Sequence, residues 1–500
     1  MDLPDLETLE PFSPELSDEY LEHHGVLPLG IEDGRLLVAT WNDEVDPQVL
    51  DDLQMLGKVP VELVVMPEAD LRGAIRRIYT NGSLTAENVI AHLSEETVRG
   101  EGDTDSALDD LVALAYEAPV VKLVNLLLLE ALEARASDVH LESYAGGLRV
   151  RYRIDGVLQE APVPPPRLAA AVVSRLKIMA ELDIAERRVP QDGRIRLNMS
   201  NRQVDVRVST LPTLHGESVV LRLLDKEQGR ISLHELGMSE ETLRRFNEVI
   251  NRPHGIVLST GPTGSGKTTT LYAVVERIRT GREKIVTVEE PVEYELPGVP
   301  QVPVNTKVGL TFANALRSIL RQDPDVMLVG EIRDRDTADI AIHAALTGHL
   351  VLSTLHTNDA VTALTRLIDI GIEPYLVAST VEAVLAQRLV RRICSACSAP
   401  SELSVEERLA LGLADGEELP VWSGAGCPEC RGTGFRGRTG IYELLVMDDE
   451  LRSSLSHDAS TVKLNQLARR KGMQLLHEDG LRHVREGTTT AAEVLRVARA

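Results

Sequence analysis

Short apolar runs and helix-spaced apolar residues alternate in the first part of the chain. Between Leu27 and Tyr79 the pattern predicts a strand, a hairpin turn, a strand, a helix, a strand and a helix. The turn falls at Glu32–Gly34, because these residue types favour tight connections between strands. Asp46 is the predicted N-cap of the first helix, since its carboxylate can accept backbone N–H groups there. Residues 1–80 are therefore predicted to form a small α/β domain.

The pattern changes in the next part of the chain. Residues 81–110 are polar and acidic and cannot bury a core, so they are predicted to form a flexible acidic linker. In residues 111–228, apolar and polar residues alternate at Leu148–Ile154 and Gln203–Thr210, which predicts half-buried antiparallel strands. A helix-spaced stretch, Leu168–Glu181, lies between them. These features indicate an α+β domain.

The last part of the chain, residues 229–500, alternates apolar strands with helices. This order is typical of a largely parallel, doubly wound α/β sheet. A chain of 500 residues is also too long for one hydrophobic core, and its length favours about three domains.

No segment has the composition of a membrane span. The most apolar stretch, Val120–Ala131, is interrupted by three polar residues and is predicted to be an amphipathic helix, whereas a span needs about 20 apolar residues. The acidic segment Met1–Glu10 does not resemble a secretory signal, which begins with basic residues and continues with an apolar core. We therefore expect a cytoplasmic protein.

Charge is unevenly distributed along the chain. The formal net charge is −24, and residues 1–110 hold 26 of the acidic residues but only 6 of the basic ones. Binding to nucleic acid is driven by basic surface, and stacking of bases needs aromatic residues, which make up only 3% of the chain. The charge pattern therefore argues against a nucleic-acid partner. The acidic first domain either confers solubility alone or serves as a docking surface.

A glycine-rich segment follows the apolar strand Gly255–Thr260, and a helix-spaced segment comes after it. Glycines in this context let backbone N–H groups wrap phosphate oxygens at the N-terminus of a helix. In such a P-loop, Lys267 is expected to contact the β- and γ-phosphates of ATP, and Thr268 to bind Mg²⁺. The alternative is a glycine-rich turn that binds nothing. The predicted nucleotide-binding residues are Gly261, Pro262, Thr263, Gly264, Ser265, Gly266, Lys267, Thr268 and Thr269.

Acidic residues follow two other apolar strands of the same region. Ligands bind at the carboxyl ends of strands in open α/β sheets, so Glu293 and Glu331 are candidates for the site. Asp325 lies at the opposite end of its strand, about 20 Å from Glu331 at ~3.3 Å per residue, so it cannot share the magnesium. Glu331 is the predicted acid on the metal side, acting either directly or through water. Alternatively, both glutamates are solvated turn residues.

Two histidines flank the next apolar strand. His349 enters the strand and His356 leaves it, so only His356 is placed to sense a γ-phosphate. The alternative for each histidine is a hydrogen-bonded structural role.

The four cysteines form two pairs with the spacing CxxC, separated by 29 residues. Each such pair supplies two thiolates at one turn, and two pairs together suit a tetrahedral Zn²⁺ site. A site with four cysteine ligands leaves no open position for a substrate, so the zinc is expected to be structural. Disulfides are the alternative, and a reducing cytosol disfavours them. The predicted ligands are Cys394, Cys397, Cys427 and Cys430.

Taken together, these motifs resemble a known family. The P-loop, the acidic segment Thr287–Glu295 and the stretches Leu328–Asp334 and Thr347–Asn358 look like the Walker A, Asp, Walker B and His boxes of secretion ATPases. With the paired cysteines and the segments Ala136–Glu142 and Gln191–Arg194, nearly the whole chain resembles the assembly ATPases of bacterial type II secretion systems.

The resemblance implies a fold and an activity. It implies a RecA-like P-loop ATPase domain with a tetracysteine zinc subdomain at 394–430, preceded by a PAS-like α+β domain and a small N-terminal α/β docking domain. It implies a homohexamer that hydrolyses ATP to drive pseudopilus assembly. Glu293 would orient or activate the attacking water while Glu331 supports magnesium. Arginines matching those that surround the phosphates in the family are Arg207, Arg222, Arg317, Arg321, Arg333 and Arg438; each could equally be a surface ion-pair partner.

The resemblance also implies partners. The N-terminal domain would dock on the cytoplasmic domain of the inner-membrane L component, and the motor would act on the platform F component. The protein would then be peripheral on the inner membrane and reach it only through these partners. A type IV pilus extension ATPase is the nearest alternative, because it shares the same boxes and cysteine pairs. An ATP-binding scaffold and a nucleic-acid translocase are alternatives from other classes.

Overall fold

The computed structural model describes residues 12–13, 16, 18–32, 34–42, 45–75, 114–199, 202–225, 231–410 and 419–498. The predicted linker at 81–110 lies outside these residues. The chain divides into two compact units, Met1–Leu224 and Asp225–Ala500. Within the described part of the chain, none of the helices combines the length and apolar character needed to cross a membrane.

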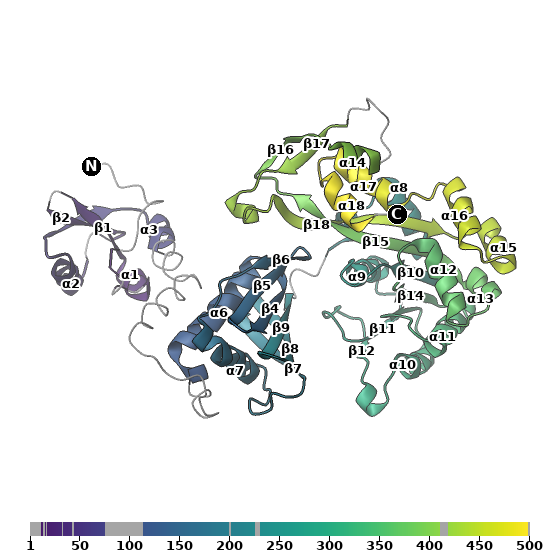
Figure 1. Ribbon diagram of the computed structural model, residues 1–500, viewed down its shortest axis with the longest axis horizontal. Coiled ribbons are helices and arrows are strands. Elements are labelled where there is room, and N and C mark those ends of the chain that lie inside the picture. The colour runs from purple at the N-terminus through teal and green to yellow at the C-terminus, as the bar shows by residue number, and fades with distance from the viewer. Residues whose placement is uncertain are drawn as a thin grey trace. The chain divides into compact units, whose positions relative to one another are not determined.

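The N-terminal part of the first unit is a three-stranded sheet with helices packed on it (Figure 1). Its elements are α1 (Asp18–His24), β1 (Val26–Glu32), β2 (Arg35–Thr40), α2 (Pro47–Gly57), β3 (Val61–Val65) and α3 (Glu68–Ile75). β1 and β2 form an antiparallel hairpin, and β3 runs parallel to β2. Asp46 caps α2 by accepting the backbone N–H of Gln48 at 2.9 Å. Leu21 of α1 is fully buried in this core, so the pattern from Leu27 onward missed one helix.

The rest of the first unit is a six-stranded sheet in the order β6-β5-β4-β9-β8-β7. Its elements are α6 (Ala118–Glu133), β4 (Ala136–Tyr144), β5 (Gly147–Ile154), β6 (Val157–Glu160), η3 (Pro166–Leu168), α7 (Ala169–Met179), β7 (Gln191–Met199), β8 (Arg202–Thr213) and β9 (Gly216–Asp225). The buried residues of α6 and α7 share one core with those of the sheet. Lys177 of α7 forms an ion pair with Glu217 at 2.8 Å, and both side chains are almost completely buried.

The second unit is built on a seven-stranded sheet in the order β12-β11-β13-β14-β10-β15-β18. Its strands are β10 (Gly255–Thr260), β11 (Ile285–Glu289), β12 (Gln301–Pro303), β13 (Val326–Val329), β14 (Leu350–Leu355), β15 (Val381–Ile393) and β18 (Phe435–Val446). The pairings are parallel except for β18, which runs antiparallel to β15. β10, β13 and β14 are buried along their whole length, as expected for strands covered on both faces.

Helices cover both faces of this sheet (Figure 1). One face packs against α10 (Phe312–Ile319), α11 (Arg335–Leu346), α12 (Ala360–Asp369), α13 (Pro374–Thr380), α15 (Asp449–His457) and α16 (Thr461–Arg470). The other face packs against η4 (Leu233–Leu236), α8 (Glu240–Ile250) and α9 (Lys267–Ile278). Short 3-10 turns, η5 (Thr306–Val308) and η6 (Leu320–Gln322), flank α10. The unit is therefore the doubly wound, largely parallel sheet that the sequence predicts.

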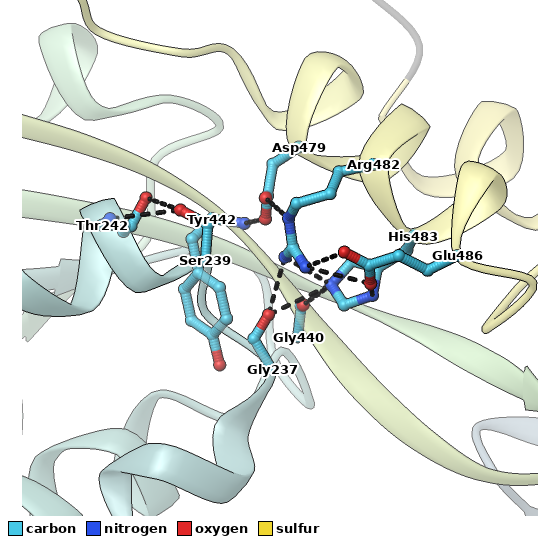
Figure 2. Close-up of polar contacts among 9 residues, drawn as sticks. All are labelled: Gly237, Ser239, Thr242, Gly440, Tyr442, Asp479, Arg482, His483 and Glu486. Carbon is cyan, nitrogen blue, oxygen red and sulfur yellow. Dashed lines mark hydrogen bonds and ion pairs between the residues drawn. The ribbon is translucent and has the colours of Figure 1, made fainter.

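The chain beyond β15 adds a small subdomain and two helices. The subdomain holds β16 (Ser398–Ser401), α14 (Val405–Ala410), β17 (Val421–Gly424) and η7 (Pro428–Cys430), and the helices are α17 (Leu476–Arg485) and α18 (Ala491–Val497). Figure 2 shows how α17 is fastened to the start of the unit: Arg482 donates to the carbonyl of Gly237 at 2.8 Å and pairs with Asp479. Asp479 in turn accepts the backbone N–H of Tyr442 at 2.9 Å.

Candidate functional site

The P-loop connects β10 to α9, and its conformation requires glycine. Gly261 and Gly266 have φ angles of 150° and 89°, in the region that side-chain-bearing residues rarely adopt. A Cβ on Gly261 would lie 2.6 Å from the backbone oxygen of Gln387 in β15, so the loop also packs too closely for a side chain. The glycines of the motif therefore shape a backbone cradle at the N-terminus of a helix, the arrangement that binds phosphate.

Lys267 begins α9 and folds over the P-loop. Its Nζ donates to the carbonyl oxygens of Gly261 at 2.7 Å and Pro262 at 3.0 Å. Burial lowers the pKa of Lys267 to about 8; the nearby carboxylate of Glu331 opposes this shift, and the guanidinium of Arg388 adds to it. The charge of Lys267 is therefore affected by Glu331, which follows β13, and by Arg388, which belongs to β15.

Glu331 lies just beyond β13, and each of its two carboxylate oxygens contacts a different residue. One carboxylate oxygen lies 2.5 Å from Arg333, and the other lies 3.3 Å from Nε2 of His356. Arg333 also approaches Glu290, at 3.7 Å. The second oxygen of Glu331 is buried and accepts no hydrogen bond within the described residues. A buried carboxylate oxygen with free lone pairs beside a P-loop fits a Mg²⁺ ion or its water, because magnesium prefers oxygen ligands.

Backbone contacts hold the ends of β13 and β14 together. Thr354 Oγ1 donates to the carbonyl of Gly330 at 2.7 Å, and Ile332 donates its N–H to the carbonyl of Thr354 at 3.1 Å. β14 lies between β13 and β10, so the segments that follow these three strands share one edge. The structure thus brings together Lys267, Glu331 and His356.

The acids after β11 separate into different environments. Glu289, the last residue of the strand, is buried and accepts hydrogen bonds from Tyr272 Oη, from Thr287 Oγ1 at 2.5 Å and from Gln301 Nε2 at 3.1 Å. Glu289 is therefore committed to joining α9, β11 and β12. After a cis peptide bond at Glu290–Pro291, the turn places the backbone of Glu293 beside the Tyr272 hydroxyl. The catalytic role expected of Glu293 stays a prediction.

The two histidines that flank β14 differ as their positions in the sequence suggest. His349 Nδ1 lies 2.9 Å from the carbonyl of Ala344, at the end of α11. His356 is about half exposed and reaches Glu331. His349 therefore has a structural contact, whereas His356 lies at the edge that carries the P-loop.

In the first unit, Arg194, Arg207 and Arg222 line an open hollow of about 420 Å³ together with Asp192. Arg222 is held there by Asp138, whose carboxylate oxygen accepts its Nε at 3.0 Å. A hollow lined by three guanidinium groups is suited to an anionic group such as a phosphate.

The four cysteines lie together, with all sulfur atoms within 4.8 Å of one another. Cys394 and Cys427 approach to 3.8 Å, as do Cys397 and Cys430. Burial opposes ionisation of Cys430, but N–H groups of Cys427 and Gly434 and the neighbouring thiols lower its pKa to about 6. Four sulfurs at these separations fit a tetrahedral Zn²⁺ site, since thiolates bind zinc at about 2.3 Å.

Two residues of the site were not found from the sequence. Gln387 Nε2 donates to the carbonyl of Ser265 in the P-loop at 2.8 Å, and Arg388 donates to the carbonyl of Asn358 at 2.9 Å. The available signal was a pair of polar residues inside an otherwise apolar part of the strand, Ala383–Val390.

Comparison with known proteins finds matches to residues 1–83 and to residues 113–496. A family model described as type II/IV secretion system protein matches residues 113–496, and one described as MshEN domain matches residues 1–83. The chain is 46% identical over 498 residues to the type II secretion system protein E of Pseudomonas aeruginosa, covering 99% of both chains. It is 43% identical over 491 residues to the type II secretion system ATPase E of Vibrio cholerae, covering 95% of this chain and 96% of that one.

Other relatives widen the comparison. The type IV pilus assembly ATPase PilB of Myxococcus xanthus is 45% identical over 481 residues, covering 95% of this chain and 85% of its own length. Among solved structures, the pilus retraction motor PilT with bound ADP is similar with a TM-score of 0.51 and 26% identity, over 75% of this chain and 96% of that chain. The ATPase DotB of Legionella pneumophila has the same fold, with a TM-score of 0.57 and 21% identity over 75% of this chain and 95% of its own.

Proposed function

Since this chain belongs to the type II/IV secretion system protein family, we propose that it is the ATPase motor of a type II secretion system, driving pseudopilus assembly and protein export with the energy of ATP hydrolysis. The observation that carries this function is the shared edge of β10, β13 and β14, where Lys267, Glu331 and His356 meet. A P-loop lysine beside a carboxylate with one buried oxygen that accepts no hydrogen bond within the described residues suits hydrolysis of a nucleoside triphosphate.

Within the proposed site, each residue has a role that its position supports. The backbone of the P-loop and Lys267 would hold the β- and γ-phosphates of ATP, and Thr268 and Glu331 would hold Mg²⁺, which neutralises charge on the phosphate oxygens. His356 would sense the γ-phosphate through its contact with Glu331. Glu293 would orient the attacking water.

Arg207 and Arg222 are further candidates for contacts with the phosphates. The hollow lined by Arg207 and Arg222 offers guanidinium groups for a phosphate. An arginine delivered from another domain or subunit would stabilise charge in the transition state only when the assembly has the right geometry. This favours a homohexamer as the working form, in which hydrolysis changes the arrangement of domains.

We also propose a location and partners for the motor. The motor would be cytoplasmic and peripheral on the inner membrane. Its acidic N-terminal domain would bind a basic face on the cytoplasmic domain of the L component, and the ATPase would act on the platform F component. Such an electrostatic interface should weaken as salt rises, because exposed charges are screened beyond about 8 Å at 0.15 M. The cysteine cluster would hold a structural Zn²⁺.

The most direct test is ATP hydrolysis by the purified oligomer, with and without a reconstituted inner-membrane platform. We expect turnover that needs Mg²⁺ and rises when the platform is present. Lys267→Gln should abolish turnover. Lys463→Gln is the control and should leave turnover unchanged, because Lys463 is an exposed residue of α16 that pairs with Asp458. Equal turnover in wild type and Lys267→Gln would contradict the assignment.

A type IV pilus extension ATPase is the second candidate, supported by the similarity to PilB of Myxococcus xanthus. Deletion of the gene separates the two. Loss of exoprotein export with normal surface pili supports the type II function, and loss of pili with normal export supports the second candidate.

A further inference from the structure

Two consecutive polar residues are buried in the middle of β15. Gln387 is 1% exposed and Arg388 is 9% exposed, and the strand residues on both sides are apolar. Burying an amide and a guanidinium is costly unless their hydrogen bonds are satisfied by fixed partners. Both side chains have such partners, and the partners lie on the two loops that flank the nucleotide site.

Gln387 is bonded at both ends of its carboxamide. Nε2 donates to the carbonyl of Ser265 in the middle of the P-loop at 2.8 Å, and Oε1 accepts from Ser259 of β10 at 3.2 Å. A Cβ on Gly266 would lie 3.1 Å from the same Nε2. The carboxamide therefore links the P-loop backbone to β10 and β15.

Arg388 reaches the loop that follows β14. Its guanidinium donates to the carbonyl of Gln387 at 3.0 Å, to the carbonyl of Asn358 at 2.9 Å and to Oδ1 of Asn358 at 3.2 Å. Asn358 is two residues beyond His356. The same loop also contacts the end of β10, since the hydroxyl groups of Thr260 and Thr357 lie 2.7 Å apart.

Charged groups surround Arg388 on both sides. Glu443 of β18 and Asp359 attract its guanidinium, although burial lowers the pKa of Arg388 overall. Glu443 accepts the backbone N–H of Ala360 at 2.8 Å, and burial raises its pKa to about 7. On the other side, the positive charge of Arg388 contributes to the low pKa of Lys267. The arginine is thus the cation between the P-loop lysine and the loop that carries His356.

We propose that Gln387 and Arg388 are positioning residues that couple the P-loop to the loop of His356. Gln387 holds the P-loop backbone in position, and Arg388, the next residue of the strand, holds Asn358. His356 then contacts Glu331 only when the P-loop backbone is held in its position. Neither side chain contacts the nucleotide in this scheme. The inference rests on the proposed ATPase function, because it assigns a role to residues around the same site.

The variants separate the two contacts. Gln387→Ala should weaken ATP binding about tenfold, because the P-loop backbone loses its support. Arg388→Gln should lower kcat about tenfold or more while ATP binding changes less than about threefold, because misplacement of a catalytic group acts on turnover. Arg392→Gln, which removes an exposed arginine of the same strand, is the matched control and should match wild type.

A conservative variant supplies a readout that loss of structure alone would not change. Arg388→Lys keeps the positive charge of the buried group but not the forked guanidinium that donates to both oxygens of Asn358. It should therefore lower kcat as Arg388→Gln does, while ATP binding and the melting temperature stay close to wild type.

Kinetics and thermal melting of the full-length oligomer test the inference. Lower kcat in both Arg388→Gln and Arg388→Lys, with ATP binding and melting temperatures close to wild type, supports it. Wild-type kcat in Arg388→Gln, wild-type ATP binding in Gln387→Ala, or activity losses that only follow the folded fraction, would overturn it. Absence of turnover in wild type would instead refute the proposed ATPase function, so the two failures are distinguishable.

Discussion

The carboxylate of Glu331 lies 3.3 Å from Nε2 of His356, across the ends of two neighbouring strands. The other oxygen of the same carboxylate lies 2.5 Å from Arg333. Glu331 therefore joins a histidine and an arginine beside the P-loop lysine. Any group that draws Glu331 toward the phosphates also changes the contacts of both neighbours.

Replacing His356 tests whether this contact serves catalysis. We expect His356→Gln to lower kcat about tenfold with little change in ATP binding, because the site loses the group that is proposed to sense the γ-phosphate. His349→Gln is the matched control at the other end of β14, where the ring contacts the carbonyl of Ala344. It should cost about 1 kcal/mol of stability and leave kcat unchanged. Similar kinetics for the two variants would remove His356 from the mechanism.

The acids after β11 give a second pair of variants. Glu293→Gln should keep ATP binding and lose hydrolysis, because an amide cannot accept a proton from water. Glu289→Gln should instead destabilise the fold by about 1–3 kcal/mol, since an amide cannot accept all the hydrogen bonds that Tyr272, Thr287 and Gln301 donate to the carboxylate. Turnover and chemical denaturation of both variants check this, and full activity in Glu293→Gln would exclude it as the residue that activates water.

Metal analysis tests the cysteine cluster. Purified protein should contain one zinc per chain, bound by the four sulfurs that lie within 4.8 Å of one another. Cys397→Ser should lose the metal and lower the melting temperature, because a structural zinc contributes to folding energy. Glu429→Gln changes an exposed residue between Cys427 and Cys430 and should keep the zinc. Metal-free wild type with unchanged stability would show that the cluster is not a zinc site.

The buried contacts of α17 predict a dependence of stability on pH. Burial, together with the charge of Arg482, lowers the pKa of His483 below its usual 6.5, against the attraction of Asp479 and Glu486 (Figure 2). The neutral ring therefore stabilises the fold fully above pH 6.5, and this contribution is lost as the pH falls below that value toward the lower pKa of the folded state.

Denaturation of wild type and His483→Gln at several pH values checks this. The difference in unfolding free energy between the two should shrink as the pH falls from about 7 to about 5. A constant difference would mean that the pKa of the ring is the same in the folded and unfolded states.

Much of the second unit could be predicted from the sequence, because its signals are local. The P-loop is a strand, a glycine-rich turn and a helix in direct succession, and the strands before Glu331 and His356 are short, mainly apolar runs. Parallel strands bring their carboxyl ends to one edge, so the meeting of Lys267, Glu331 and His356 followed from the order of the elements.

Other features depend on contacts between distant residues, which a pattern does not reveal. Gln387 and Ser265 are 122 positions apart, and only the register of β15 against β10 brings them together. Glu289 and Glu293 are both acids after one strand, and the buried partners of Glu289 distinguish them. The short helix α1 was missed because its seven residues span too few turns to show a clear period.

The proposed motor function depends on Mg-ATP hydrolysis at the edge of the sheet where Glu331 lies. The most direct measurement is steady-state hydrolysis by the oligomer, with ATP binding measured in parallel, for wild type, Glu331→Gln and Asp325→Asn. Asp325 is the control because it lies at the opposite end of β13, where it accepts the N–H of Lys284 at 2.7 Å. We predict that Glu331→Gln binds ATP but does not hydrolyse it, whereas Asp325→Asn hydrolyses ATP as wild type does. Hydrolysis by Glu331→Gln at the wild-type rate would contradict the account.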